Sequence, residues 1–180
     1  MKRFLILFLF LIFNCKEKEY LRVEQEKESG SMISMRNFDR SSFKEDGELE
    51  WKLHGDESYV FPKENRTIVY GFSFLQYEKG KKKSSITGER GEINHSEKSV
   101  ELSGNVRVKT DDGKYIESDS LHYNLEDKTL TSDAEVLVYS DGTTIRGKGL
   151  RADKSINKFT ILKPSAITVG GSSPLKEKEK

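Results

Sequence analysis

A unit that occurs twice between residues 102 and 161 dominates the pattern of apolar and polar positions. Val106 aligns with Val136 at an offset of 30 residues. After a gap of one residue, Asp112-Gly113 aligns with Asp141-Gly142. A third and weaker copy precedes these two, around residues 87–100. Repetition at a fixed period is typical of a chain built from one supersecondary unit used several times.

Within each unit, apolar and polar residues alternate one by one. Val106 and Val108 are separated by Arg107, and residues 121–125 repeat the alternation. A period of two indicates a β-strand with one apolar and one polar face. The Asp-Gly pairs supply the positive φ angles that a tight hairpin needs. Each unit is therefore predicted to form two antiparallel strands joined by a turn.

Turn signals continue at regular intervals along the chain from residue 43 to residue 171. Between them, several predicted strands carry a small residue near their middle, where glycine often marks a bulge or a sharp bend. These residues are Gly88, Gly104, Ser118 and Gly147. Bends of this kind let long strands fold over into two facing layers. The sequence therefore predicts an all-β fold, an open and twisted β-roll of long antiparallel strands.

Composition excludes several classes of function. Hydrophobic and charged residues each make up 34% of the 180 residues, so the predicted interior is a thin apolar layer. The 31 basic and 30 acidic residues leave no net field that would attract nucleic acid. No nucleophile elbow, zinc-protease or phosphate-loop motif is present, and the three histidines lack metal-ligand spacing. We therefore expect neither an enzyme nor a bound metal or cofactor.

The N-terminus has a separate pattern. Lys2 and Arg3 precede an unbroken apolar run at 4–13. That run is too short to span a membrane, which takes about 20 residues, and suits the hydrophobic region of a signal peptide. The following Ile12-Phe13-Asn14-Cys15 resembles a bacterial lipobox, which implies cleavage before Cys15 and lipid attachment to it. A plain signal peptide and an uncleaved anchor are the alternatives.

These patterns divide the chain into four predicted parts. Residues 1–14 form the signal peptide, and the polar residues 15–42 form a flexible tether. Residues 43–170 form the β-roll, and residues 171–180 form a disordered, charged tail.

Several short motifs in the roll resemble those of a known family. Leu102-Ser-Gly104-Asn-Val106, the turn at 112–113 and Ser118-Asp-Ser-Leu121-x-Tyr123 resemble the OstA-like repeat of the lipopolysaccharide-transport proteins LptA and LptC. Upstream, Trp51-Lys-Leu53-x-Gly55 resembles the opening strand of LptC. Predicted membrane attachment at the N-terminus favours LptC over soluble LptA. The resemblance covers about residues 43–169.

This resemblance implies an open β-jelly roll with a V-shaped cross-section that holds the acyl chains of lipopolysaccharide between its two layers. It also implies a periplasmic protein at the inner membrane that receives lipopolysaccharide from an ABC transporter. The N-terminus departs from the family, because typical LptC has a transmembrane helix where this sequence predicts a lipid anchor on Cys15. An LptA-like bridge protein, joined edge to edge, is the expected onward partner. A structural or surface-exposed β-repeat lipoprotein, acting as a scaffold or adhesin, is the alternative.

Two sets of site residues follow. The uncharged, β-forming segment 165–169 and the strand before it predict a C-terminal edge that pairs with the partner, and residues about 48–60 predict the opposite edge. The partner edge comprises Phe159, Ile161, Ile167 and Val169. The inward-facing set, predicted to line the lipid groove or to form the core of a closed sandwich, is Trp51, Leu53, Phe72, Phe74, Val106, Val108, Ile116, Leu121, Tyr123, Leu130, Val136, Val138, Ile145, Leu150, Phe159 and Ile161.

Overall fold

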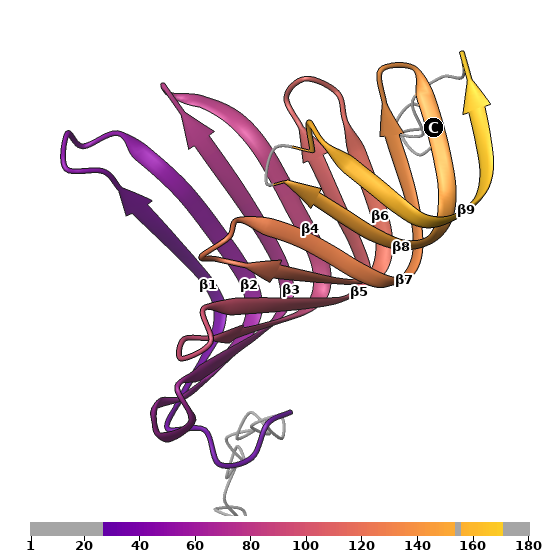
Figure 1. Cartoon of the computed structure of the whole chain (residues 1–180). Coiled ribbons are helices and arrows are strands. Elements are labelled where there is room, and N and C mark those ends of the chain that lie inside the picture. The colour runs from indigo at the N-terminus through magenta and orange to yellow at the C-terminus, as the bar shows by residue number, and fades with distance from the viewer. Residues whose placement is uncertain (1–26, 154–155, 171–180) are drawn as a thin grey trace, which may run out of the picture.

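The computed structural model describes residues 27–153 and 156–170, which form one antiparallel sheet (Figure 1). Each strand pairs with the next along the chain, in the order β1 to β9 without crossovers. The strands are β1 (Ile33–Phe43), β2 (Leu49–Phe61), β3 (Arg66–Glu78), β4 (Lys81–Asn94), β5 (Ser99–Thr110), β6 (Tyr115–Asn124), β7 (Thr129–Ser140), β8 (Thr143–Asp153) and β9 (Phe159–Val169). The prediction of an open all-β roll of long antiparallel strands is confirmed.

The hairpin turns lie where the turn residues predict them. Gly113 and Gly142 have φ angles of 87° and 77°, which is the region that favours glycine. A short 3-10 turn, η1 (Pro62–Glu64), joins β2 to β3, and Asn65 follows it in the left-handed conformation. These turns keep successive strands adjacent, so the chain meanders along the sheet.

The sheet begins earlier than the sequence indicates. Strand β1 starts at Ile33, inside the segment predicted as a tether, and pairs along its length with β2. The prediction that residues 48–60 form an edge is therefore wrong, because β2 has a neighbour on both sides. Strand β1 is mostly exposed and lacks clear alternation, which explains why it was missed. The predicted signal peptide, Cys15 and charged tail lie outside the described residues.

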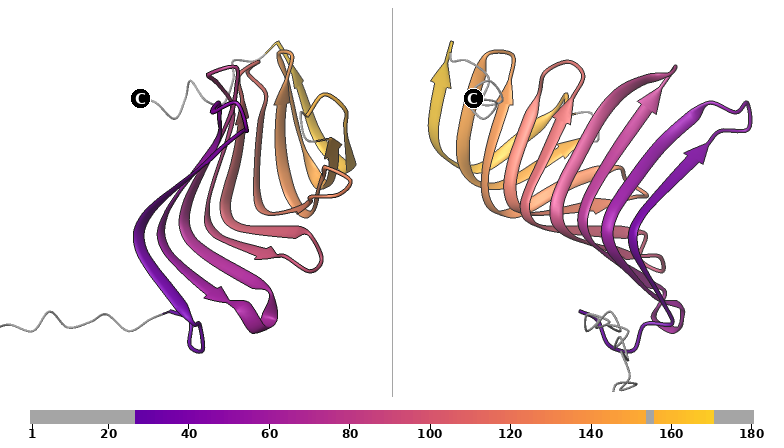
Figure 2. Two further views of the ribbon diagram at one scale, coloured as in Figure 1. Left: turned by 90° about the vertical axis from the view of Figure 1, so that its left-hand side faces the viewer. Right: turned by 180° about the vertical axis from the view of Figure 1, so that it is seen from behind.

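Every strand bends near its middle, so the sheet folds over itself into two arms (Figure 2). The pairing register shifts at these bends, for example between Ser103 and Val106 on β5 and at Gly147 on β8. Strict alternation is also interrupted at the bend of β6, where Ile116 and Leu121 both belong to the buried core although they are an odd number of residues apart. The mid-strand small residues predicted to mark bends do lie at these points.

Glycines at the bend make room for aromatic rings from the adjacent strand. A Cβ added to Gly88 would lie 2.8 Å from the ring of Phe72, and one added to Gly55 would lie 2.6 Å from the ring of Phe38. Because the ring occupies the space that a side chain would take, it covers the exposed glycine backbone on the inner face. The two layers can therefore approach closely at the fold line.

On later strands, serines stand at the bend in place of glycines. Their hydroxyls bond to backbone groups where the bend interrupts the hydrogen bonds between strands. The buried Ser118 hydroxyl donates to the carbonyl of Glu135 at 2.9 Å. The buried Ser132 hydroxyl donates to the carbonyl of Ser120 at 2.8 Å and accepts from the Ala134 N–H at 3.0 Å. Buried carbonyls without a partner are costly, so these two hydroxyls stabilise the bend.

Replacing Ser118 with alanine tests this role. The substitution leaves the Glu135 carbonyl without its bond, and we expect it to lower the free energy of unfolding by about 1–3 kcal/mol. Urea unfolding followed by circular dichroism measures the change. The control is Ser84→Ala, which removes only an exposed bond to Gln76 and should change stability by less than about 0.5 kcal/mol. Equal effects of the two substitutions would contradict the account.

Candidate functional site

The inner face of one arm carries a continuous row of apolar side chains. Residues directly opposite each other in antiparallel strands project from the same face, so the register fixes their common direction. The row begins beside Arg40 on β1 and crosses every later strand. Its members, from β2 to β9, are Leu53, Phe74, Ile86, Val108, Ile116, Val138, Ile145 and Ile167.

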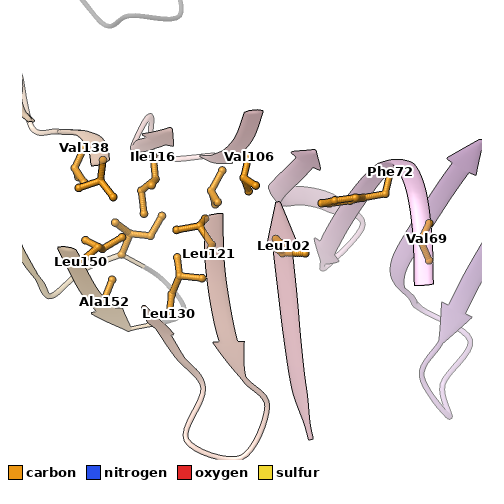
Figure 3. Close-up of a cluster of buried hydrophobic side chains, with 13 residues drawn as sticks. Val69, Phe72, Leu102, Val106, Ile116, Leu121, Leu130, Val138, Leu150 and Ala152 are labelled. Atoms are coloured by element: carbon orange, nitrogen blue, oxygen red, sulfur yellow. The ribbon is translucent and has the colours of Figure 1, made fainter. Parts of the chain in front are cut away.

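The inner face of the second arm carries a matching row of apolar side chains, which begins only at β4. The sheet register pairs these residues from β4 to β9 as Ile93, Val100, Tyr123, Leu130, Ala152 and Phe159. Because the strands fold over at the bend, the two rows face one another and members of both belong to one hydrophobic cluster. Figure 3 shows Val138 and Ile116 pointing toward Leu150 and Leu121 across this interior. We call the space between the two arms the trough.

All of the predicted inward-facing residues lie on this inner face. Trp51, Phe74 and Ile145 are half-buried and share the face by register, and the rings of Trp51 and Phe74 are 5.9 Å apart. Leu53, Tyr123, Phe159 and Ile161 are half-buried against the cluster. The buried members are Phe72, Val106, Val108, Ile116, Leu121, Leu130, Val136, Val138 and Leu150.

Several inner residues were not foreseen. Ile86 and Val100 lie at the borders of the weak third repeat, where comparison with the two clear copies could have found them, and Leu102 lies at the start of the first clear copy. Phe38 gave no signal because its strand does not alternate. Ile156 lies in the β8–β9 turn, a position where sequence reasoning expects polar residues, yet it is 1% exposed.

The trough is open at one end and filled at the other. On β2, Trp51 and Leu53 are only half-buried, and Phe38 on β1 is likewise half-buried. On the later strands, Val138 and Leu150 are each 0% exposed. The side chains of β6 to β8 thus fill most of the space between the arms, although Ile145 on β8 is half-buried and Ile167 on β9 is 63% exposed. Those of β1 and β2 leave apolar surface accessible.

The trough and the outer face differ sharply in polarity. Burial raises the pKa of the Tyr123 phenol, because the apolar surroundings disfavour its charged form. The outer face instead carries ion pairs, such as Arg107 with Glu117 at 3.9 Å, and so do the hairpin turns, where Lys98 lies 2.6 Å from Glu126. In that pair the hydrogen bond from Lys98 is the main cause that lowers the pKa of the Glu126 carboxyl. The arrangement therefore offers an apolar surface inside and a solvated one outside.

The described chain starts on the outer face of β2 and β3, beside a small second cluster of Tyr59, Phe61 and Ile68. The Lys27 N–H donates to the Tyr59 hydroxyl at 3.1 Å, and the Tyr70 hydroxyl donates to the Glu28 carboxylate at 2.6 Å. Lys27 Nζ also lies 3.4 Å from the Glu57 carboxylate. These contacts hold the segment before β1 away from the trough.

Other kinds of site find no support in the described part of the chain. Residues 27–153 and 156–170 contain no group of histidine, cysteine and acidic side chains placed to bind a metal ion. Within those same ranges there is no helix of the length and apolarity needed to cross a membrane. The trough, with its continuous apolar rows, is therefore the candidate site in the described chain, and its surface suits an apolar ligand.

Comparison with known proteins agrees with this geometry. A search of curated proteins finds no match. Among solved structures, the sheet is similar to the crystal structure of LptH, the LptA homologous periplasmic component of the lipopolysaccharide transport device from Pseudomonas aeruginosa. The TM-score is 0.51 at 12% sequence identity, over 66% of this chain and 92% of that chain, so the likeness concerns the fold.

The family comparison reaches further along the sequence. The model of one family, described as lipopolysaccharide-assembly, LptC-related, matches residues 4–167. This match includes all strands except the last residues of β9, and it extends into the segment before the sheet. The chain therefore belongs to the LptC-related family of lipopolysaccharide-assembly proteins.

Proposed function

We propose that this protein is a periplasmic component of lipopolysaccharide transport whose trough carries the acyl chains of the lipid. The observation that supports this most strongly is the unbroken apolar row from Leu53 on β2 to Ile167 on β9. Apolar contact is non-directional and stabilises by about 25 cal/mol for each Å² removed from water. A lipid on such a surface can move across the strands without breaking specific bonds.

The accessible part of the trough favours transport over a purely structural role. A scaffold gains nothing from leaving Trp51 and Phe74 half-buried on an inner face, since burying them further would stabilise the fold. A carrier needs such a surface, because acyl chains must reach it. The likeness to LptH, itself named as part of a lipopolysaccharide transport device, supports the same proposal.

Photo-crosslinking in cells tests the proposed lipid path. A benzophenone amino acid at Phe74 or Tyr123 replaces a half-buried aromatic ring on the inner face, and we expect it to trap lipopolysaccharide. The matched positions Ser73 and His122 are the preceding residues and project from the outer face, so they should trap little. Immunoblotting of the crosslinked protein for lipopolysaccharide gives the readout, and equal labelling of both faces would refute the proposal.

The C-terminal edge supports a proposed partner contact. Strand β9 pairs with β8 on one side and has no neighbour on the other among the described residues. Its last part is accessible, with Ile167 63% and Val169 78% exposed. Phe159 and Ile161 instead pack against the cluster, so partner pairing should concentrate on residues 165–169. We propose that an LptA-like protein adds a strand here, bound through backbone hydrogen bonds.

Two C-terminal truncations test whether the partner binds the β9 edge or the residues that follow it. A chain ending at residue 164 loses the accessible half of β9 but keeps Phe159 and Ile161 in the core, and we expect it to fold and lose partner binding. A chain ending at residue 170 keeps all of β9 and should bind normally. Co-purification with an LptA-like protein, together with circular dichroism of each chain, measures the two effects. Normal binding by the shorter chain would place the contact elsewhere.

At the opposite edge, strand β1 takes the place that we had expected for residues 48–60. Met32 is 67% and Ile33 is 52% exposed, so this edge also presents apolar side chains. We propose that β1 meets the periplasmic roll of the inner-membrane transporter that delivers the lipid. Crosslinks from Ile33 to that transporter would support this contact, and crosslinks to the LptA-like protein instead would reverse the direction of the bridge.

The proposed location follows from the N-terminus. Residues 4–13 precede Cys15 as a hydrophobic region precedes a lipidation site, and we propose that lipid on Cys15 anchors the protein at the inner membrane. The contacts of Lys27 and Glu28 with the outer face then leave the trough clear of the anchor. Mass spectrometry of the N-terminal peptide from membranes should show acyl groups on Cys15, and an unmodified peptide that begins at Met1 would refute this anchor.

A further inference from the structure

One polar contact joins the two arms of the sheet at the filled end of the trough. Lys114, at the β5–β6 turn, donates from Nζ to Asn157 Oδ1 at 2.5 Å in the β8–β9 turn. The same Nζ lies 2.6 Å from the Asp112 carboxylate. Strands β5 and β8, which lead into these two turns, run in opposite directions, so the turns lie at opposite ends of the strands. They meet because the two arms fold toward each other.

Other ion pairs near the hairpin turns each lie along one end of the sheet and do not join the two arms. Lys98 with Glu126 joins two turns along one end of the sheet, and Lys83 at the start of β4 reaches Asp111 in the next turn along the other end. Their side chains are between about two-fifths and three-fifths exposed, whereas only 10% of the Lys114 side chain is exposed. The Lys114 side of the Lys114–Asn157 bond is therefore shielded from water, and a hydrogen bond from a charged group is stronger there than at the open surface.

Ile156 lies beside this bond and fills the space between the arms. It is 1% exposed and belongs to the same hydrophobic cluster as Val138 and Leu150. Its φ angle is 55°, a left-handed conformation that a β-branched residue rarely adopts. The backbone conformation is unfavourable for isoleucine, so burial of its side chain must offset the strain at this position.

We propose that Ile156 and the Lys114–Asn157 bond form a closing contact that keeps acyl chains out of the β6–β9 end of the trough until the two arms separate. This inference rests on the proposed function, since it assumes that the trough carries lipid. Ile156 occupies space that an acyl chain would need, and methylene groups can replace its apolar contacts within the cluster. Lipid would then first occupy the open β1–β4 end, and it would reach the β6–β9 end only after the two arms separate.

Photo-crosslinking in cells at two aromatic positions of the full chain tests the closing contact. A benzophenone amino acid at Phe74 reports lipid at the open end, and one at Phe159 reports lipid at the filled end. We expect Asn157→Ala and Ile156→Gly each to raise the ratio of Phe159 to Phe74 labelling by about threefold or more, because occupancy scales with the fraction of open molecules. Lys98→Met, which removes a turn-to-turn contact along one end, should leave the ratio unchanged.

The outcomes separate this inference from the proposed function. An unchanged ratio in both opened variants, with Phe74 still labelled, would overturn the closing contact and leave lipid carriage intact. Absence of lipid at Phe74 in the unmodified chain would overturn the proposed function and the inference together. Glycine relieves the backbone strain at 156 but removes a buried side chain, so Asn157→Ala, at an exposed position, provides the test if Ile156→Gly fails to fold.

Discussion

The burial of a single apolar face is the constraint on which the rest of the structure depends. A sheet of nine strands with one apolar face and one charged face must cover the apolar face or leave it in water. No helix or second domain among the described residues covers it. The strands therefore bend, and each arm covers the other. The small residues at the bend, from Gly55 to Gly147, permit this folding, and Ser118 and Ser132 restore the hydrogen bonds that the bend breaks.

The same constraint accounts for the proposed function. Two arms that diverge toward β1 cannot fill the space between them, and so apolar side chains such as Trp51 and Phe74 remain accessible inside. Within the described residues, the meandering sheet also leaves one side of β1 and one side of β9 unpaired, which makes each edge a template for another strand. A trough that ends at two such edges can continue into neighbouring proteins of similar fold. The proposed lipid carriage and the proposed edge-to-edge assembly would therefore both follow from one architecture.

Much of this architecture could be predicted from the sequence, because alternation and turn residues are local signals. The two clear repeats determine β5 to β8, and residues such as Val108 and Leu150 were assigned to the inner face from their period alone. Strand β1 could not be found in this way. It is an edge strand whose residues are mostly exposed, so its sequence is selected little for alternation and its place depends on pairing with β2. Ile156 was missed for a related reason, since only the folding together of distant strands places that turn in the core.

The central claim is that acyl chains lie between the two arms, and Trp51 provides a direct measurement of it. Trp51 is the single tryptophan of the chain and lies on the inner face, with its ring 5.9 Å from that of Phe74. Its fluorescence can therefore be titrated with lipids that carry bromine atoms on their acyl chains, which quench tryptophan only at short range. The account predicts strong, saturable quenching by these lipids and protection of Trp51 from iodide in water. Unchanged Trp51 emission at lipid concentrations where the protein demonstrably binds lipopolysaccharide would contradict it.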